Sequence, residues 1–297
     1  MTRTEIILRQ IVRNYRTRLR FLAGKADNYS GNDAYPLDKR ALSLAKVFAN
    51  YLSYGDLATL PLRGARVLEL GPGDTLSIGY LFAKAGASEV VCLDKFHYSY
   101  DTPKERKLCE LLQLDPASFQ DRVRPLGGYS LEETTQLFKP ESFDLIVSTA
   151  VLEEFANLDA SFAAMYRLLR PGGRTLHKID LSDYGAFAKR GFSPLEFLTV
   201  PDRVYHYMSS SAGVPNRKLT NYYRDKTRGL GFQTEIWITN AHGAGVYDQP
   251  RRGLTAADCA PEQHRMIDQI RPRLLPRYRE LPIEDLIPSG IFLVAEK

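Results

Sequence analysis

Residues 67–79, VLELGPGDTLSIG, predict a β-strand that runs into a glycine-rich turn and then into a helix. Glycine at positions 71 and 73 permits a tight turn and a close approach of a ligand to the backbone, and the N–H groups of the next helix point at that ligand. The alternation of strands and helices continues to residue 181, which is typical of a parallel sheet covered on both faces. The expected strands are 67–70, 89–93, 122–126, 143–148 and 174–181, and the expected helices begin near Thr75 and cover 103–113, 130–137 and 159–169.

The segments outside this unit are less regular. A helix is expected over 37–55, and a later helix and two strands are expected over 219–229, 233–240 and 290–297. The 297 residues are 44% apolar, enough for a full core. A long irregular segment inside a compact domain is usually functional, so 182–218 predicts a lid or cap. We expect an N-terminal helical extension over 1–60 and one domain over 61–297, with the cap at 182–218 and a second insertion at 241–285.

The N-terminal segment predicts a basic amphipathic helix. Residues 1–25 hold seven basic residues against the single acid Glu5, a local charge of +6 in a chain of net charge +5. We expect the apolar stripe to dock on the chain's own domain and the arginines to face solvent. Peripheral contact with an anionic membrane surface is the alternative. The stripe consists of Leu8, Val12, Tyr15, Leu19 and Leu22, and the basic face of Arg9, Arg13, Arg16 and Arg20.

The apolar runs and the cysteines indicate in which cellular compartment the protein is expected. The longest apolar runs, such as EVVCLD and IFLVAE, are far shorter than the ~20 residues of a membrane span. The first 25 residues contain no uncharged signal-peptide segment, so we expect a cytoplasmic protein. Cys92, Cys109 and Cys259 lack a CxxC spacing, which argues against a disulfide framework or a zinc site. Cys92 lies in an apolar run and is expected to be buried.

Several ligands fit a glycine-rich turn, and the flanking residues narrow the choice. A phosphate-binding P-loop needs lysine followed by Ser or Thr after its last glycine, and GDTLSIG has neither pair. A dinucleotide fingerprint has its third glycine where this chain has Leu76, which weakens the case for a nicotinamide cofactor. Asp94 ends the second strand 21 residues after Gly73, where a carboxylate accepts hydrogen bonds from ribose hydroxyls. A ligand that carries a ribose is therefore expected.

Three stretches together carry a resemblance to a known family. They are VLELGPGD, with an acid and two glycines, VVCLDKF, which supplies Asp94, and FDLIVSTAVLEEF followed by LLRPGG. In this order and spacing the chain resembles the class I S-adenosylmethionine-dependent methyltransferases over residues 66–181, although Thr75 stands where many members have a third glycine. The segments LHKIDLSDY and NRKLTNYYRDKTRGLGF also resemble a bacterial branch associated with saccharide or natural-product modification. The resemblance implies an α/β, Rossmann-like, doubly wound, mostly parallel seven-stranded sheet.

The resemblance also implies S-adenosylmethionine as the cofactor, and roles for individual residues. Gly71 and Gly73 would line the methionine tail, Glu69 would face the cofactor through the turn, and Asp94 would hold the ribose hydroxyls. A charge that favours the dipole of the nearby helix is the alternative reading of Glu69. Three further contacts are expected after the second, third and fourth strands: Phe96 over the adenine, Tyr129 beside Gly128 at the adenine edge, and Ser148. Phe96 as a packed aromatic at a strand end fits the sequence equally well.

The sequence of the loop after the fourth strand narrows the range of expected methyl acceptors. It reads STAVLEEF, which lacks the Asn/Asp-Pro-Pro-Tyr segment of enzymes that methylate exocyclic amines and the Pro-Cys nucleophile of cytosine C5 methylation. Asp180 and Asp183 could imitate a magnesium cluster, but paired aspartates at a strand end more often cap backbone groups or bind arginine. We therefore assign no metal ligand and keep a metal site as the less favoured alternative. Outside residues 1–25 the chain has a net charge of −1, which makes a nucleic-acid acceptor improbable.

Methyl transfer to a hydroxyl benefits from a positioned base. Such a base should lie beyond the carboxyl ends of strands four and five, because ligands bind at that edge of an open α/β sheet. Asp180, His177 and Glu153 are the preferred catalytic candidates. Positioning of the two reactants is an alternative source of the rate acceleration. The wider set of candidates adds Glu154, Asp183 and Tyr184.

The predicted cap is rich in aromatic and polar side chains, which either contact a sugar or form a small core of their own. We therefore expect a methyltransferase that acts on a hydroxyl of a saccharide or other small-molecule acceptor. An N-methyltransferase of a natural-product amine and a cofactor-binding module without catalysis are the alternatives. The cap side chains in question are Tyr184, Phe187, Phe192, Phe197, Tyr205, Tyr207, Arg203, His206, Asn216 and Arg217.

Overall fold

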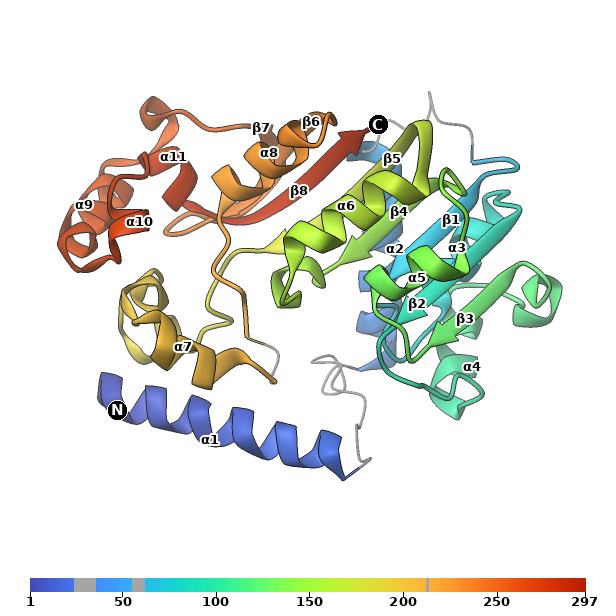
Figure 1. Ribbon diagram of the computed structural model, residues 1–297, viewed down its shortest axis with the longest axis horizontal. Helices are drawn as coiled ribbons and strands as arrows, with labels where there is room; N and C mark the ends of the chain where they lie inside the picture. Colours follow the sequence, from blue (N-terminus) through green and yellow to red (C-terminus); the bar gives the residue numbers. More distant parts are fainter. Residues whose placement is uncertain (24–35, 55–61, 212–213) are drawn as a thin grey trace.

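A computed structural model describes residues 1–23, 36–54, 62–211 and 214–297. Its centre is an eight-stranded sheet in the order β3-β2-β1-β4-β5-β8-β6-β7 (Figure 1). The first five strands in that order are parallel, and β8 runs antiparallel to both β5 and β6. The strands are β1 (Arg66–Leu70), β2 (Glu89–Asp94), β3 (Val123–Gly127), β4 (Phe143–Thr149), β5 (Leu169–Asp180), β6 (Gln233–Ala241), β7 (Gly245–Arg252) and β8 (Pro288–Glu296).

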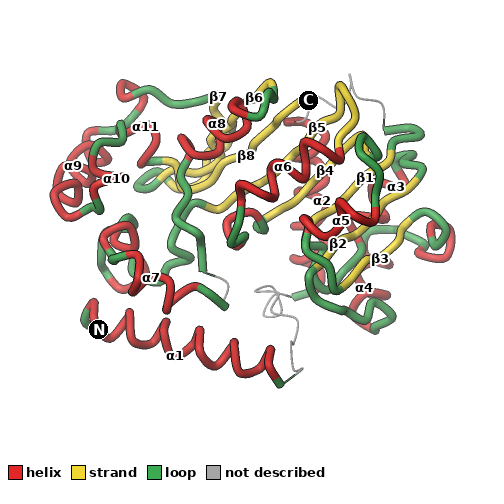
Figure 2. The backbone as a smooth tube through the Cα atoms, viewed as in Figure 1, coloured by secondary structure: helices red, strands yellow, loops and turns green. Residues whose placement is uncertain are grey.

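Helices cover both faces of the sheet (Figures 1 and 2). One face packs against α5, α6 and α8, with Phe162 and Tyr223 fully buried in its core. The other face packs against α2 and α3, with Tyr51 and Phe82 fully buried. These helices and the nearby α4 are α2 (Leu37–Tyr54), α3 (Ser77–Lys84), α4 (Pro103–Leu111), α5 (Leu131–Leu137), α6 (Leu158–Leu168) and α8 (Thr220–Gly229).

Local sequence signals explain several helix starts. Thr102 accepts a hydrogen bond from the backbone N–H of Glu105 and is followed by Pro103, a residue suited to the first helical position. Ser130 and Glu133 form a reciprocal capping box at the start of α5. Because α5 follows β3 directly, this capping box holds Ser130 and Glu133 near the carboxyl edge of the sheet.

The predicted α/β, mostly parallel fold is confirmed, but the sheet has eight strands and not seven. The additional strand is β7, in the segment expected to be an insertion. Its sequence GVYDQPRR contains a proline and shows no apolar alternation, because β7 is an edge strand exposed over most of its length. The expected boundary between extension and domain, at residues 60–61, lies on or next to residues outside the described part.

A third core lies beside the sheet and joins three segments distant in the sequence. The region after β5, the segment after β7 and the first turn of α1 bury their apolar side chains together, with Phe187, Phe197 and Ile6 almost fully buried. The helices involved are α1 (Arg3–Leu22), α7 (Asp202–Ser209), α9 (Pro261–Ile270), α10 (Pro276–Arg279) and α11 (Ile283–Leu286). We refer to residues 182–211 and 214–218 as the cap.

The N-terminal helix docks by a different face from the one predicted. Ile6 is 1% exposed, Asn14 is 5% exposed, and Ile11 is partly buried against the cap. The predicted stripe is exposed instead, from 49% at Val12 to 76% at Leu22. The prediction was wrong because α1 has a second apolar row through Ile6, Ile7 and Ile11, and the tertiary partner selects that row. Among the described residues, no helix is both long and apolar enough to cross a bilayer.

Candidate active site

A large cavity lies at the carboxyl edge of the parallel strands. Its volume is about 2490 Å³, well above the roughly 300–1,000 Å³ of a typical small-molecule pocket. Residues that follow β1, β2, β3, β4 and β5 line it, together with side chains from α1, α2 and the cap. The cavity therefore has room for two ligands side by side.

The turn after β1 forms one wall of this cavity. Gly71 and Gly73 have φ angles of 65° and 68°, in the left-handed region that favours glycine. A Cβ on Gly71 would lie 2.6 Å from Cγ2 of Val151, so the turn packs directly on the loop after β4. A Cβ on Gly73 would meet nothing within 4 Å. The backbone at Gly73 is therefore open to a ligand.

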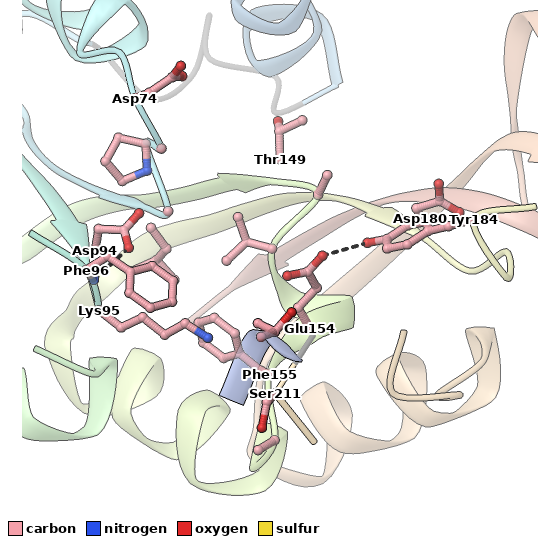
Figure 3. Close-up of a pocket in the computed structure, with 18 of the residues that line it drawn as sticks. Asp74, Asp94, Lys95, Phe96, Thr149, Glu154, Phe155, Asp180, Tyr184 and Ser211 are labelled. Atoms are coloured by element: carbon pink, nitrogen blue, oxygen red, sulfur yellow. Dashed lines mark hydrogen bonds between the residues drawn. The ribbon is translucent and has the colours of Figure 1, made fainter. Parts of the chain in front are cut away.

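Asp94, at the end of β2, lies next to this turn and lines the same cavity (Figure 3). Its side chain is 8% exposed, and Oδ1 accepts a hydrogen bond from the backbone N–H of Phe96 at 3.0 Å. Burial raises the pKa of Asp94 to about 6, and backbone hydrogen bonds from Phe96 and Gly73 oppose that rise. Hydroxyl groups that donate to this carboxylate would replace the water it has lost.

Glu69 lies one step deeper in the wall. It is 6% exposed, and the thiol of Cys92 donates to Oε2 at 3.3 Å. Burial raises the pKa of Glu69 to about 8. A positively charged group of a ligand beside this carboxyl group would stabilise its ionised form. Cys92 is 1% exposed, as expected for a cysteine in an apolar strand.

The other expected cofactor contacts divide into two groups. Phe96 and Tyr129 line the cavity, and the Lys95 ammonium lies 4.8 Å from the centre of the Phe96 ring. Ser148 does not line it; it is 1% exposed and hydrogen-bonds Nδ1 of His177 at 2.7 Å. Its neighbour Thr149 lines the cavity and pairs with the Tyr51 hydroxyl at 2.7 Å. The strand extends one residue further than predicted, which moves the loop contact from Ser148 to Thr149.

An acidic cluster with one tyrosine lies on the opposite side of the cavity, where β4 and β5 end (Figure 3). The hydroxyl of Tyr184 lies 3.3 Å from Oε1 of Glu153 and 3.3 Å from Oε1 of Glu154. Glu153 also accepts the backbone N–H of Asp180 at 3.2 Å. Three of these side chains, Glu154, Asp180 and Tyr184, line the cavity, whereas Glu153 lies behind them at 1% exposure.

The carboxyl groups of this cluster differ in their protonation. Burial raises the pKa of Glu153 to about 8, so Glu153 is largely protonated at neutral pH. Burial also raises the pKa of Glu154, while Lys95, Tyr184 and Arg13 lower it. Glu154 is exposed and lines the cavity. It is the carboxylate of the pair that can exchange a proton with a ligand.

Tyr184 is held in this position by the turn that opens the cap. Its φ angle of 53° is left-handed, which is costly for a residue with a side chain. Asp183 stabilises the turn, because its carboxylate accepts the backbone N–H groups of Gly185, Phe187 and Ala188 at 2.7, 2.6 and 3.1 Å. Asp183 therefore caps backbone groups. The described residues contain no cluster of three or more His, Cys, Asp or Glu able to hold a metal ion.

His177 does not reach the cavity. It lies in β5 at 0% exposure, between Ser148 and Thr175, and both of its ring nitrogens have hydrogen-bond partners. Burial lowers the pKa of His177 to about 3. A neutral, fully bonded imidazole inside the sheet has no access to an acceptor, so we remove His177 from the candidate bases.

Most of the cap aromatics form a core. Phe187, Phe197 and Tyr205 are at most 5% exposed, and the Arg217 guanidinium lies 3.8 Å from the centre of the Tyr205 ring. Asn216 ties the cap to the loop after β4 by donating to the backbone carbonyls of Leu152 and Phe155 at 2.8 and 3.3 Å. Of the two readings of these aromatics, the small core fits all but Tyr184, which lines the cavity, and Tyr207, which is 63% exposed.

Two walls of the cavity were not predicted from the sequence. In α2, Arg40 forms an ion pair with Asp74 in the turn after β1. This pair fixes α2 beside the turn, as a wall of the cavity. In α1, eight side chains line the cavity, among them all four arginines of the predicted basic face, which are exposed as expected but lie at the cavity. The arginine spacing in α1 was visible in the sequence, but nothing there indicated which way that face points.

One part of the chain matches a known protein family. Residues 68–177 match the model of a methyltransferase domain family. The fold is similar to that of an S-adenosylmethionine-dependent methyltransferase from Mesorhizobium loti, with 16% identity over 80% of this chain and 93% of that chain and a TM-score of 0.44. It is also similar to a phosphoethanolamine N-methyltransferase from Haemonchus contortus, with 17% identity over 87% of this chain and 52% of that chain and a TM-score of 0.45. A search of curated proteins found no significant match.

The fold and the family match define the class of the protein. It is a class I methyltransferase that uses S-adenosylmethionine, and residues 68–177 are its methyltransferase domain. It is an enzyme, which sets aside the reading as a cofactor-binding module without catalysis.

Proposed function

We propose that the protein transfers a methyl group from S-adenosylmethionine to a hydroxyl group of a saccharide or other small-molecule acceptor. The observation that carries this proposal is the arrangement of the cavity. A buried carboxylate and an open glycine turn lie on one side, and an acidic cluster containing Tyr184 and Glu154 lies on the other.

The residues on the first side fit the proposed cofactor. Gly73 leaves the backbone open where a Cβ would otherwise stand, and Gly71 lets the turn pack against Val151. Asp94 offers a desolvated carboxylate for the two ribose hydroxyls. Glu69 suits the ammonium group of the methionine tail, and Phe96 and Tyr129 offer ring surfaces for the adenine. When bound, the cofactor supplies a methyl group on a sulfonium centre.

On the second side, Glu154 is our choice for the general base. Its carboxylate lines the cavity and its raised pKa brings it closer to neutrality, which suits proton transfer at physiological pH. Glu154 accepts the proton from the acceptor hydroxyl as that oxygen takes the methyl group. Tyr184 hydrogen-bonds Glu154 and orients it, and Asp180 lies beside them as a further acceptor contact. Glu153 supports Tyr184 from behind.

The charge of the cavity favours an uncharged or anionic acceptor over an amine. Among the described side chains that line the cavity, eight are basic and six are acidic. Burial raises the pKa of two of those acids, Glu69 and Asp94, to about 8 and about 6. A cationic amine would enter a cavity with an excess of positive charge, so N-methylation of an amine is the less favoured alternative.

Transfer of label tests the proposal. The full chain is incubated with S-adenosylmethionine labelled in the methyl group and with fractionated cell extract. We expect base-stable label in a hydroxyl-bearing small-molecule or saccharide fraction, and at least about a hundredfold less with Glu154→Gln. Leu22→Ala, outside the cavity, serves as the control variant. Label in an amine, or transfer unchanged by Glu154→Gln, would contradict the proposal.

A further inference from the structure

The N-terminal helix is fixed to the cap by specific polar contacts. Asn14 donates to the carbonyl of Tyr207 at 2.9 Å and to the hydroxyl of Ser210 at 3.0 Å, and it accepts the backbone N–H of Ser211 at 2.6 Å. Near the start of the helix, Arg3 pairs with the buried carboxylate of Glu196 at 2.8 Å. These contacts, together with the buried Ile6, set the rotation of α1 about its own axis.

With this rotation, the opposite face of α1 becomes a wall of the active-site cavity. Figure 1 shows α1 beside α7, running on beneath the sheet. The wall carries a row of arginines, four or three residues apart, next to a row of apolar side chains. It consists of Leu8, Arg9, Val12, Arg13, Arg16, Thr17, Leu19 and Arg20. We call this set the α1 wall.

Within the part of the chain that the structure describes, three of the four arginines of the α1 wall lack a carboxylate partner, and three of its apolar side chains are largely exposed. Arg9, Arg16 and Arg20 have no carboxylate partner in the described part of the chain. Leu8, Val12 and Leu19 are 56%, 49% and 49% exposed, although each belongs to a residue type that is usually buried. Unpaired cations beside uncovered apolar surface are complementary to a ligand with an anionic group and an apolar part.

The α1 wall also lies within electrostatic range of the proposed base. Arg13 is one of the charges that lower the pKa of Glu154. The cavity volume of about 2490 Å³ leaves space for a sizeable acceptor beside the cofactor. A ligand on the α1 wall is therefore in the same cavity as the acidic cluster, so the wall and the proposed base can contact one molecule.

We propose that the α1 wall binds the acceptor, and that the acceptor is an anionic amphiphile. A phosphate or similar anionic group pairs with Arg9, Arg16 and Arg20, while an apolar segment lies along Leu8, Val12 and Leu19. This inference rests on the proposed function, because it specifies the acceptor of the same site. It narrows that acceptor from any hydroxylated small molecule to one that carries both an anionic group and an apolar chain.

Calorimetric titration of the full chain tests this binding. The probe is dodecyl phosphate below its micellar concentration, compared with inorganic phosphate and with dodecyl maltoside. We expect dodecyl phosphate to bind at least about tenfold more tightly than either comparison compound, because only it satisfies both rows. S-adenosylhomocysteine is titrated into the same samples, so that loss of the cofactor site is recognised separately.

Matched pairs of variants on α1 locate the binding. We expect Arg16→Gln to weaken dodecyl phosphate binding about tenfold, and Arg18→Gln, on the same helix but outside the wall, to leave it unchanged. We expect Leu19→Ala to weaken binding several-fold and Leu22→Ala to have no effect. All four variants should bind S-adenosylhomocysteine as the wild type does.

Three results would overturn the inference. The first is equal binding of dodecyl phosphate and dodecyl maltoside, and the second is equal loss in Arg16→Gln and Arg18→Gln. The third is binding to phosphatidylglycerol vesicles without binding to monomeric dodecyl phosphate, which would make α1 a membrane-docking helix. In each of these cases intact S-adenosylhomocysteine binding leaves the proposed function standing, whereas absent S-adenosylhomocysteine binding would contradict the proposed function itself.

Discussion

Replacing Asp94 with asparagine should stabilise the free protein while weakening its hold on the cofactor. Burial raises the pKa of Asp94 to about 6, from a usual value near 4. The folded protein therefore holds the proton more tightly than the unfolded chain does, and the ionised carboxylate costs stability above pH 6. A difference of about two pKa units corresponds to roughly 3 kcal/mol. This cost declines as the pH falls from 6 to 4 and vanishes below both pKa values, at about pH 3, where the carboxyl group is protonated in both states.

Asparagine has the same shape and no charge to desolvate. It keeps one oxygen that can accept the backbone N–H of Phe96, the bond that Asp94 makes at 3.0 Å. We expect Asp94→Asn to raise the free energy of unfolding by about 1–3 kcal/mol at pH 7.5 and by about a third of that amount at pH 4.5.

The cofactor affinity should change in the opposite direction. Asparagine loses the charge that strengthens hydrogen bonds from the ribose hydroxyls, each worth about 1.5–3 kcal/mol. We expect S-adenosylhomocysteine to bind Asp94→Asn at least about tenfold more weakly at pH 7.5. In the wild type the affinity should fall about tenfold between pH 7 and pH 5, as the carboxylate takes up a proton.

Urea unfolding and calorimetric titration at several pH values measure both effects. Asp144→Asn is a matched control, since Asp144 is a similarly buried aspartate that accepts the Arg66 backbone N–H at 2.6 Å at the start of β4, away from the cavity. This control should lose stability and keep its cofactor affinity. The reasoning is refuted if Asp94→Asn is destabilised at pH 7.5 and binds S-adenosylhomocysteine normally.

Three other predictions concern catalysis, docking of the N-terminal helix and the glycine turn. Glu154→Gln should lower kcat by about 10² or more with an unchanged Kd for S-adenosylhomocysteine, and steady-state kinetics that show an effect of only a few-fold would assign acceleration to positioning. In urea unfolding, Ile6→Ala should cost about 2–4 kcal/mol and Leu8→Ala less than about 0.5 kcal/mol, because only Ile6 is buried; equal costs would contradict the docking described. Gly71→Ala should be far more destabilising than Gly73→Ala, since only the first methyl group meets Val151; the reverse order of melting temperatures would refute this.

The parallel half of the fold was predictable because the local sequence pattern of its strands, turns and helix caps indicates each element. Val90 to Leu93 is a continuous apolar run, and Val67 to Leu70 is interrupted only by Glu69, as strands buried on both faces require. Glycine turns and caps separate these strands from helices. β7 was not predictable, because an edge strand needs no apolar pattern. Its pairing with β6 is decided by the neighbouring strand and not by its own residues.

The candidate site was predictable to the extent that the chain order fixes it. Asp94 and the turn at Gly71 follow adjacent strands, so they must meet at one edge of the sheet. His177 and Glu154 show the limit of this prediction. Whether a side chain on a strand or in a loop reaches the cavity depends on the direction in which that residue points, and the sequence does not give that direction. The face of α1 was undetermined for a related reason: the helix has two apolar rows, and only the cap decides which one is buried.

The most direct test of the central claim is a crystal structure of the full chain with S-adenosylhomocysteine. The account predicts that the ribose hydroxyls lie within hydrogen-bond distance of the Asp94 carboxylate, and that the amino-acid tail lies against the turn at Gly71 and Gly73. The sulfur should face the side of the cavity that holds Glu154 and Tyr184. Ligand density elsewhere in the molecule, or a sulfur directed away from that acidic cluster, would contradict the account.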